Sequence, residues 1–534
     1  MLLQYSSAQN KHLLQQNYEN TNDIPLAIYA PERCPRLKDS LKRQLHWNFL
    51  LVSEPQEIEA LDCAAVIVVA DDGELMSTAL MQYALETKAG HDFVSSDIVF
   101  DAEGEILCAT SKSVLIASVK KELFLQVAEA NCNRRELLCR AEALAKKRVH
   151  IPYALINCRR LPEINDLFSC GKKRALLLSH EFSMTGAPIV LVSIVPVLKS
   201  LGYDVVVLGP EWDNAAPLFV DAGATVVICE TKLENSAMFG LALCSDFVLA
   251  NTVVESRAIH LLENASVPVV WWLHDAFFGY PFIEDGIPKS LGSNVRAYAV
   301  GHHAAAAMHS VRPDFQIEQL LYGLPDLTLE PRADRDFTKD GKVLFINVGS
   351  VDKRKGQDIL ARAIRKLPAE DLAKAHFLFA GKPIDPEIFR EVESLTQQYP
   401  ENVSHIPWLS REEIKALMSQ CNCIVCSSRD DPMPTFVTEG AMFGKPSIIS
   451  EHTGTAALIS QAENGFVYRN DSAKELSKLL QNAIREPEKL AAMAPACRAL
   501  YEENFTQDKF YRNVSDMIAH AGSWLEETEV LYGT

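Results

Sequence analysis

Short apolar runs without polar alternation, each followed by a stretch with helical spacing, recur along most of this chain. Strands with such runs must be covered on both faces, as they are in parallel sheets with helices on either side. The alternation of strands and helices therefore predicts an α/β fold. The first series of runs is RALLLSH (174–180), DVVVLGP (204–210), ATVVICE (224–230), SDFVLAN (245–251) and VPVVWWLH (267–274).

A second series follows a charged, proline-containing stretch without periodicity, LTLEPRADRDFTKDGK (327–342), which is typical of a linker. At 534 residues the chain is also too long for a single hydrophobic core. We therefore expect two Rossmann-like halves, with ligands at the carboxyl ends of their strands. The runs of the second series are KVLFINVGS (342–350), AHFLFAG (375–381), VSHIPWL (403–409), CNCIVCSS (421–428), PSIIS (446–450) and GFVY (465–468).

The composition is ordinary for a globular protein except for its acidic bias. Hydrophobic residues make up 48% of the chain, and its net charge of -18 argues against nucleic-acid binding, which needs an excess of Lys and Arg. No segment approaches ~18 uninterrupted apolar residues and the N-terminus is polar, so we expect a cytoplasmic protein. The 13 cysteines fit reduced thiols, and the cluster Cys421, Cys423 and Cys426 is expected in a buried strand rather than at a metal.

The stretch DPMPTFVTE (431–439) begins and ends with a carboxylate and has two prolines near its start. Pro434 can occupy the first turn of a helix without losing a hydrogen bond. The backbone N–H groups of Thr435 and Phe436 would then be free to face a ligand. We therefore expect the start of a helix to form part of a binding cleft.

Charged residues lie in this stretch and in an earlier turn. Glu439 accepts hydrogen bonds when ionised and suits a pair of ribose hydroxyls, and Asp431 can accept from hydroxyls of a sugar. In NVGSVDKRKGQDIL (347–360), Lys355 lies at a strand-to-helix junction, where it could hold a diphosphate with help from Arg354. The simpler alternatives are a glutamate that complements the helix dipole and a solvated turn.

Taken together, these segments resemble the retaining glycosyltransferase family 4. SSRDDPMPTFVTEGAMFGKPSII (427–449) is similar to its donor-binding signature, and VGSVDKRKGQDIL (348–360) to its diphosphate-lysine segment. SHEFSMTGAPIVLVSIVPVLKSLGYDVVVL (179–208) is similar to its N-terminal glycine loop, helix and second strand. PVVWWLHDAF (268–277) resembles the strand that precedes its active-site histidine. The similarity covers about residues 172 to 520.

The resemblance implies a role for each matching residue. Gly186 and Ala187 match the loop that approaches the phosphates and the acceptor, and His274 matches the histidine beside the transferred sugar. The remaining matches are Lys355 for the diphosphate, Glu439 for the ribose, Asp431 for the sugar, and Thr435 and Phe436 as backbone donors. Two positions depart from the family pattern. Ser350 replaces an arginine, so Arg354 is expected to supply the second positive charge. PMPTF replaces the commoner PFG, so the identity of the transferred sugar stays open.

The implied architecture is the α/β GT-B fold, with two Rossmann-like domains facing a cleft. The implied domains are an acceptor-side domain at 172–328, a donor domain at 340–505 and a C-terminal helix at 506–534 that crosses back. The implied reaction transfers a sugar with retention by front-face attack, in which a leaving phosphate oxygen takes the acceptor's proton and His274 orients and stabilises. No metal or cofactor is expected, because the lysine and a helix dipole neutralise the leaving diphosphate.

Before these domains, residues 24–165 follow a polar tail (1–23) and resemble the later half of a family 2 glycosyltransferase of GT-A type. The run AAVIVVADDGELM (64–76) supplies its paired aspartates. However, Val69 stands where the motif begins with Asp, and Arg134 and Arg135 stand where the family has its acidic pair. A metal site without these groups would bind poorly. We expect a degenerate, non-catalytic domain kept for docking or acceptor binding.

The expected partners are a nucleotide-sugar donor and a glycan or lipid-linked saccharide acceptor, in surface polysaccharide biosynthesis. The segment from Arg134 to Arg174 holds eleven Lys or Arg against four acids. A solvated helix face explains this bias most simply, and peripheral contact with an anionic membrane is the alternative. Two other functions stay open, which are a GT-B nucleotide-sugar epimerase and a non-catalytic scaffold that binds sugar nucleotide or glycan.

Overall fold

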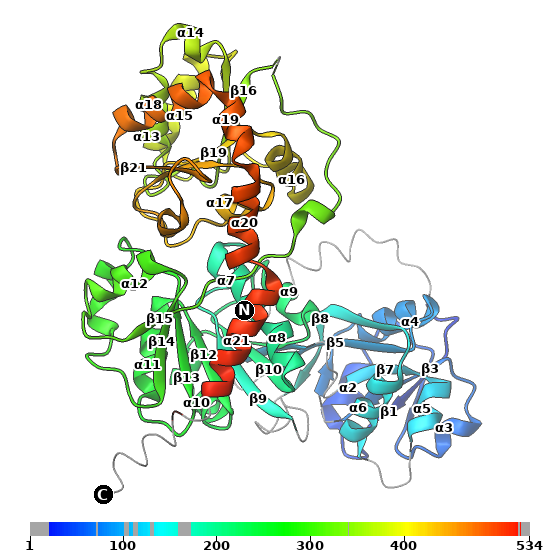
Figure 1. Ribbon diagram of the computed structural model, residues 1–534. Coiled ribbons are helices and arrows are strands. Elements are labelled where there is room, and N and C mark those ends of the chain that lie inside the picture. Colours follow the sequence, from blue (N-terminus) through cyan, green and yellow to red (C-terminus); the bar gives the residue numbers. More distant parts are fainter. Residues whose placement is uncertain are drawn as a thin grey trace, which may run out of the picture. The chain divides into compact units, whose positions relative to one another are not determined.

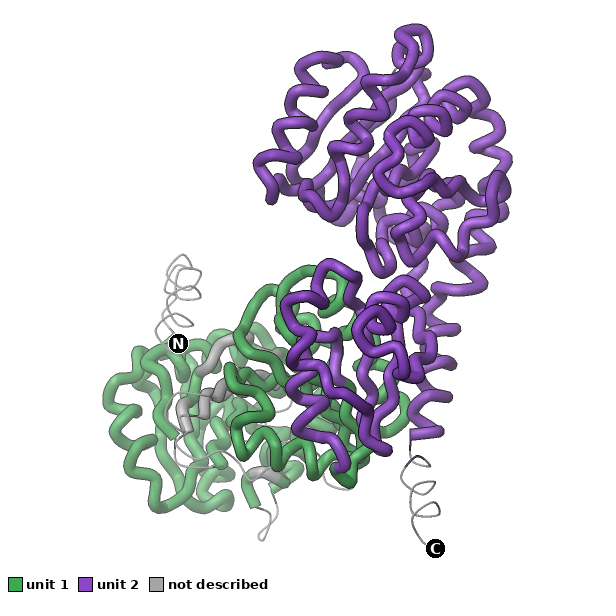
Figure 2. The backbone as a smooth tube through the Cα atoms, turned by 90° about the vertical axis from the view of Figure 1, so that its left-hand side faces the viewer, with its two compact units in different colours: residues 1–249, 265–268 green, residues 250–264, 269–534 purple. Residues whose placement is uncertain are grey.

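The computed structural model describes residues 21–70, 73–100, 106–110, 116–128, 133–158, 172–339, 341–521 and 524. The chain divides into two compact units, residues 1–249 with 265–268 and residues 250–264 with 269–534 (Figure 2). The α/β fold predicted from the sequence is confirmed in both. Within the described ranges, no helix is long and apolar enough to cross a membrane.

Unit 1 is built on one long sheet with the strand order β12-β9-β10-β11-β6-β5-β7-β3-β1-β2, while β8 pairs with β4 and β5. Its first-series strands follow the predicted runs and are buried. They are β9 (Lys173–Leu178), β10 (Tyr203–Gly209), β11 (Thr225–Cys229) and β12 (Phe247–Asn251). Their helices are α7 (Gly186–Val192), α8 (Ile194–Ser200), α9 (Ala216–Asp221) and α10 (Ser236–Leu243).

The single helix expected after the glycine loop is divided into α7 and α8, which meet at Ser193. Pro196 is the third residue of α8. Proline lacks the N–H that a helix interior requires, whereas the first turn has no intrahelical use for it. The proline therefore accounts for a new helix start at this point.

The N-terminal part of unit 1 is a mixed sheet (Figure 1, blue and cyan). Strands β2, β1 and β3 are parallel, and β7, β5 and β6 continue antiparallel. β6 then pairs antiparallel with β11, so this part shares its sheet with the first-series strands. The strands are β1 (Leu26–Tyr29), β2 (Phe49–Val52), β3 (Ala65–Val69), β4 (Gly73–Leu75), β5 (Phe93–Phe100), β6 (Ile106–Thr110), β7 (Ile116–Lys120) and β8 (Arg148–Cys158).

Helices of this region are α2 (Pro35–Leu41), α3 (Glu57–Ala60), α4 (Ala79–Lys88), α5 (Lys121–Val127) and α6 (Arg134–Leu144). The paired aspartates Asp71 and Asp72 of the family 2-like interpretation lie outside the described residues. So do most of the polar tail and residues 159–171, where the predicted domain boundary falls. The domain boundaries and the degenerate GT-A interpretation therefore stay predictions.

Unit 2 contains two groups of parallel strands. The smaller has the order β15-β14-β13, with β13 (Val269–Leu273), β14 (Val295–Ala299) and β15 (Ile317–Gln319). The larger has the order β18-β17-β16-β19-β20-β21. Its strands are β16 (Val343–Val348), β17 (Ala375–Ala380), β18 (Val403–Ile406), β19 (Cys423–Cys426), β20 (Ser447–Ser450) and β21 (Gly465–Tyr468).

The helices of unit 2 pack around these sheets (Figure 1). α21 reaches β13, where Phe510 stacks on Trp272 with ring centroids 5.9 Å apart. The helices are α11 (Ser256–Leu262), α12 (His302–His309), α13 (Gln357–Ile364), α14 (Ala369–Leu372), α15 (Pro386–Gln398), α16 (Arg411–Gln420), α17 (Thr435–Met442), α18 (Ala473–Arg485), α19 (Pro487–Ala492), α20 (Ala494–Asn504) and α21 (Gln507–Ala521).

Two sequence predictions for the six-stranded domain are confirmed. The apolar stripe after Gly356 is buried against the sheet, and it comprises Ile359, Leu360, Ala363, Ile364 and Leu367. The cysteine cluster forms β19 and the residue pair before it, and all three thiols are buried. Burial raises the pKa of Cys421 to about 12, which keeps that thiol protonated. These cysteines are part of the apolar core.

Candidate functional site

The six-stranded sheet has a topological switch point between β16 and β19. From β16 the chain moves outward to β17 and β18, and from β19 it moves the opposite way to β20 and β21. In open α/β sheets, ligands bind outside the carboxyl ends of the two strands at such a point. Lys355 follows β16 and Asp431 follows β19, so two of the predicted site residues lie at this position.

Lys355 and Asp431 form an ion pair, with the ammonium Nζ 2.5 Å from the carboxylate Oδ2. Arg354 adds a second positive charge, 3.8 Å from the same oxygen. Burial alone would raise the pKa of Asp431, but Lys355 and Arg354 outweigh it and hold this pKa below its ordinary value. The site therefore presents two cations whose counter-ion is one buried carboxylate, and an anionic ligand could take its place.

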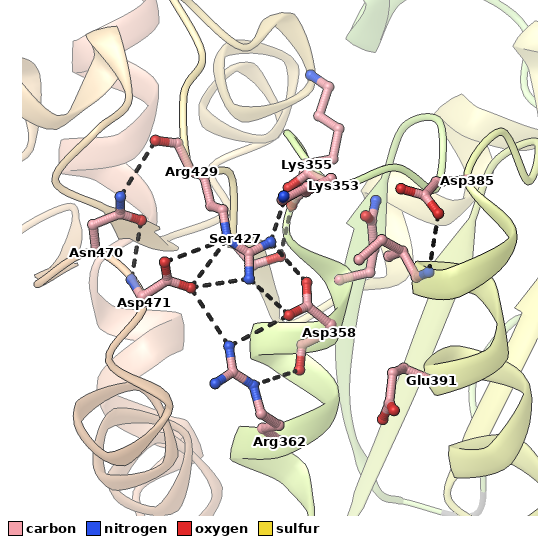
Figure 3. Close-up of polar contacts among 12 residues, drawn as sticks. Lys353, Lys355, Asp358, Arg362, Asp385, Glu391, Ser427, Arg429, Asn470 and Asp471 are labelled. Atoms are coloured by element: carbon pink, nitrogen blue, oxygen red, sulfur yellow. Dashed lines mark hydrogen bonds and ion pairs between the residues drawn. The ribbon is translucent and has the colours of Figure 1, made fainter. Parts of the chain in front are cut away.

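The loop that carries Asp431 is fixed by Arg429, which the sequence analysis did not single out (Figure 3). Its guanidinium donates to both oxygens of Asp358, at 2.8 and 2.7 Å, and lies 3.0 Å from Asp471. Its backbone N–H donates to the carbonyl of Arg354 at 2.7 Å. Asp358 in the first turn of α13 complements the helix dipole, a position that makes it a natural anchor for an arginine. Arg429 thereby joins the two loops of the switch point.

Gly356 allows the same two loops to approach closely. Its φ of +66° is left-handed, and a Cβ there would clash with the carbonyl oxygen of Ser427. The Ser427 hydroxyl donates to the carbonyl of Lys355 at 3.0 Å. Gly356 therefore meets a packing requirement as well as starting the helix, because it lets Lys355 lie beside the Asp431 loop.

Helix α17 begins at Thr435, one residue later than the sequence analysis placed it, because Pro434 is the N-cap rather than a first-turn residue. Among the described residues, the backbone N–H groups of Thr435 and Phe436 make no hydrogen bond, whereas that of Val437 donates to the Pro434 carbonyl at 3.1 Å. The two predicted backbone donors are thus available to a ligand at the start of an eight-residue helix.

Glu439 is buried one turn into α17, and its carboxylate accepts from Arg411 at 2.8 Å. Arg411 is the first residue of α16 and is half-exposed. Sequence reasoning missed it, although the capping box of Ser410 and Glu413 marks the helix start that positions it. Glu439 therefore has a cationic partner that is different from the Lys355 and Arg354 pair of Asp431.

His274 is the first residue after β13 and is partly buried, with its ring edge against Trp272 at 4.3 Å between centroids. Its neighbour Asp275 accepts from the Val253 N–H at 2.6 Å, and burial raises the pKa of Asp275 to about 6. Further along this loop, the backbone N–H of Phe278 donates to Asp430 at 2.7 Å. The segment after His274 is thus attached to the residue next to Asp431.

Gly186 and Ala187 belong to unit 1, where they begin α7 after the N-cap Thr185. The loop before them is held by Glu181, which accepts from the hydroxyls of Ser183 at 2.6 Å and Thr185 at 2.7 Å. A Cβ at Gly186 would meet no heavy atom within 4 Å. The backbone at this glycine is therefore open to close approach by a ligand.

Two family models match this chain. Residues 171–307 match the model described as glycosyl-transferase family 4, and residues 331–499 match glycosyl transferases group 1. Over 235 residues the chain is 21% identical to human alpha-1,3/1,6-mannosyltransferase ALG2, covering 41% of this chain and 56% of that protein. Over 141 residues it is 23% identical to an uncharacterized 41.2 kDa protein in the cps region of Klebsiella pneumoniae, covering 26% and 37%. The chain thus spans about half, or less, of the length of these curated relatives.

Solved structures show the same fold at low identity. HepE of Anabaena in complex with UDP has a TM-score of 0.56 at 17% identity, over 65% of this chain and 99% of that one. Sucrose-phosphate synthase of Thermosynechococcus elongatus has a TM-score of 0.54 at 16% identity, over 65% and 99%. Together with the switch-point topology, these likenesses show the GT-B fold. The two family matches support a glycosyltransferase of this class.

Proposed function

We propose that this protein is a retaining, metal-independent glycosyltransferase that moves a hexosyl or related sugar from a nucleotide-sugar to a glycan or lipid-linked acceptor. The observation that carries the proposal is the contact of Lys355 and Arg354 with Asp431 at the switch point. The family matches and the UDP complex of a similar fold support it. A role in surface polysaccharide biosynthesis fits the cps-region relative.

The donor diphosphate would bind Lys355 Nζ and the Arg354 guanidinium, and the N–H groups of Thr435 and Phe436 would supply further donors. This exchanges one anion for another, so both cations keep a counter-ion. Asp431, no longer held by the lysine, could then accept hydrogen bonds from hydroxyls of the transferred sugar. The charges that Lys355 and Arg354 balance in their contacts with Asp431 are thus the same charges that a bound diphosphate would offer them.

Glu439 would accept hydrogen bonds from the ribose hydroxyls. A buried carboxylate is costly unless it is paired, and Arg411 supplies that pairing before the ligand arrives. Because Arg411 is half-exposed, its guanidinium can move aside or stay as a second contact when the ribose binds. Glu439 and Lys355 would therefore hold separate parts of one ligand.

During transfer, negative charge grows on the diphosphate as the bond to the sugar's anomeric carbon breaks. The fixed positive charges of Lys355 and Arg354 would stabilise this charge, which is why no metal is required. A phosphate oxygen would take the proton of the attacking acceptor hydroxyl on the same face, and this gives retention. His274 would orient and stabilise the sugar rather than act as the base.

A panel of nucleotide-sugars tested by thermal shift is the direct experiment. A ligand present at 100 times its dissociation constant adds about 2.7 kcal/mol to stability, which is easily measured. We expect one donor to raise the melting temperature of the wild type and to be hydrolysed slowly without acceptor. Glu439→Ala should abolish both effects, and the surface variant Lys366→Ala should abolish neither.

If no nucleotide-sugar shifts the melting temperature of the wild type, the transferase proposal fails. If a donor binds but neither hydrolysis nor transfer to any acceptor is detected, a sugar-nucleotide-binding scaffold explains the site better.

A further inference from the structure

Three phenylalanines lie exposed on the loop that follows His274. The exposed fractions of Phe277, Phe278 and Phe282 are 41%, 65% and 78%. The rings of Phe278 and Phe282 are 5.9 Å apart between centroids, so these two side chains form one surface. We call Phe277, Phe278 and Phe282 together the Phe ridge. A contiguous exposed aromatic surface marks a binding site for a ligand or partner. Burying these rings in the core would stabilise the protein, so their exposure points to a role in binding.

The Phe ridge borders a cavity of about 1070 Å³ within unit 2. Its lining includes the apolar side chains of Phe277, Phe278 and the exposed Ile384 and the basic side chains of Lys353 and Arg354. A cavity of this size holds a ligand larger than a single sugar ring. The lining therefore combines apolar and charged side chains.

The acidic residues in the cavity wall already have hydrogen-bond donors. Asp352 accepts from the Ser350 hydroxyl at 2.6 Å, and Asp385 caps α15 through the N–H of Glu387 at 2.8 Å. Asp430 lies 2.7 Å from His303 Nε2 and accepts from the Phe278 N–H. By contrast, the Lys353 ammonium has no ion pair or hydrogen bond within the described part of the chain. These hydrogen bonds orient the carboxylates but leave their charges in place, so Lys353 is the lining cation that remains available to an anionic ligand.

The Asp430 contacts also fix where the cavity lies. The backbone N–H of Phe278 binds Asp430, which immediately precedes Asp431. Asp431 is the proposed sugar-contacting carboxylate. Arg354 lines the cavity and is 3.8 Å from Asp431. The cavity thus adjoins the place where the transferred sugar would sit, which is where an acceptor has to bind.

We propose that this cavity is the acceptor subsite and that it takes an amphiphile, a saccharide joined through phosphate to a hydrocarbon chain. The phosphate contacts Lys353, and the hydrocarbon lies on the Phe ridge and Ile384, while Arg354 stays with the donor diphosphate. A sugar ring can also stack on a phenyl ring, but one ring leaves most of three phenylalanines and an isoleucine uncovered. The assignment as acceptor subsite rests on the proposed transferase function, whereas the binding chemistry does not.

Calorimetric titration with farnesyl phosphate, below the concentration at which it forms micelles, tests the binding chemistry. We expect the wild type to bind it at least about tenfold tighter than farnesol or inorganic phosphate, since each of these offers only half of the contacts. Phe278→Ala and Lys353→Gln should each weaken binding about tenfold, equivalent to ~1.4 kcal/mol. Phe278→Ala keeps the backbone N–H on Asp430, so the loop stays attached.

Matched controls are Leu329→Ala, at an exposed apolar residue outside the cavity lining, and Lys366→Gln, at an exposed lysine two residues after the end of α13. Neither should change the affinity for farnesyl phosphate. The proposal is overturned if the wild type does not bind farnesyl phosphate, or if the cavity variants behave like these controls. The proposal is also overturned if inorganic phosphate binds as tightly as farnesyl phosphate, because the cavity is then only an anion site. Binding of methyl glucoside tighter than that of farnesyl phosphate overturns it as well, because the cavity is then only a sugar site.

The nucleotide-sugar melting shift is measured on the same samples. If that shift is absent while farnesyl phosphate binds as described, the transferase function fails and the amphiphile site stands. If the shift is present and farnesyl phosphate does not bind, the donor site stands and the amphiphile acceptor is wrong.

Discussion

A basic residue lies at each of two sheet edges in this molecule, and the groups that it contacts differ between them. At the carboxyl ends of β1 and β2, Arg134 donates to the carbonyls of Ala30 at 2.8 Å and Ser53 at 3.2 Å. Its guanidinium also lies 4.3 Å from the centre of the Tyr29 ring. At the carboxyl ends of β16 and β19, Lys355 is held by Asp431 instead.

The difference lies in what a ligand would have to replace. Arg134 is bound to backbone carbonyls and to an aromatic face, which cannot leave without unfolding the strands, so this edge is filled by the protein itself. Lys355 is bound to one carboxylate, which an anionic ligand can replace charge for charge. The same edge of an α/β sheet is therefore closed in one region and open in the other, and fold alone does not decide which.

Lys355→Met should have the largest effect of these substitutions, because it removes from the open edge the cation that would bind the donor diphosphate. We expect the affinity for the nucleotide-sugar to fall by at least about 100-fold, or ~2.7 kcal/mol. The variant should also lose roughly 3 kcal/mol of stability, since Asp431 stays buried without its nearest partner. Urea unfolding and the donor melting shift measure the two losses separately.

Adding Asp431→Asn to this variant separates the two roles of the lysine. The neutral amide should restore most of the stability, because no buried charge is left uncompensated, but it should not restore donor binding. Recovery of donor binding in the double variant would show that Lys355 serves Asp431 and not the ligand.

Gly356→Ala tests whether the open edge depends on the close approach of its two loops. The added methyl group would meet the Ser427 carbonyl, and alanine is disfavoured at a φ of +66°. We expect a loss of about 2–3 kcal/mol in stability and a weaker donor shift, measured by thermal unfolding with and without donor. Gly341→Ala is a matched control, since its φ is +73° but its Cβ would meet nothing within 4 Å. If the two variants lose equal stability, the backbone angle explains the effect and the loop contact does not.

Arg134→Met tests the closed edge. It leaves two strand-end carbonyls without this donor and removes the contact with Tyr29, so we expect a loss of about 1–2 kcal/mol in urea unfolding. The nucleotide-sugar melting shift should be unchanged. A weaker shift would show that the N-terminal region takes part in donor binding, and the contrast between the two edges would then be wrong.

The sequence was most informative where chemistry and backbone geometry coincide. Lys355 and Asp431 follow strands whose apolar runs are unmistakable, so their meeting at one sheet edge could be expected. Arg429 and Arg411 could not be found this way, because each acts through a partner far along the chain, Asp358 and Glu439 respectively. The Phe ridge was also missed, since an aromatic run after a strand predicts burial, and its exposure depends on tertiary packing.

Asp275→Asn should have the smallest effect, and it extends the comparison to a buried carboxylate that forms no ion pair with any described residue. Burial raises the pKa of Asp275 from 3.8 to about 6. The folded state therefore binds the proton more tightly than the unfolded chain, and stability falls as pH rises from about 4 to 6. Asparagine removes the buried charge but still accepts from the Val253 N–H, so we expect a gain of about 1–2 kcal/mol at pH 8 and none at pH 4.

Asp326→Asn provides the matched control with the opposite sign. Hydrogen bonds from Arg498 lower the pKa of Asp326 to about 2, so its contribution to stability is present above pH 4 and is lost as pH falls toward 2. This variant should be less stable than the wild type at pH 8, where Asp275→Asn is more stable, and thermal unfolding at both pH values compares them directly. If both substitutions destabilise the protein at pH 8, Asp275 has a cationic partner in solution. Asp275 would then belong with the carboxylates held by a cation, and its contrast with Asp326 would be wrong.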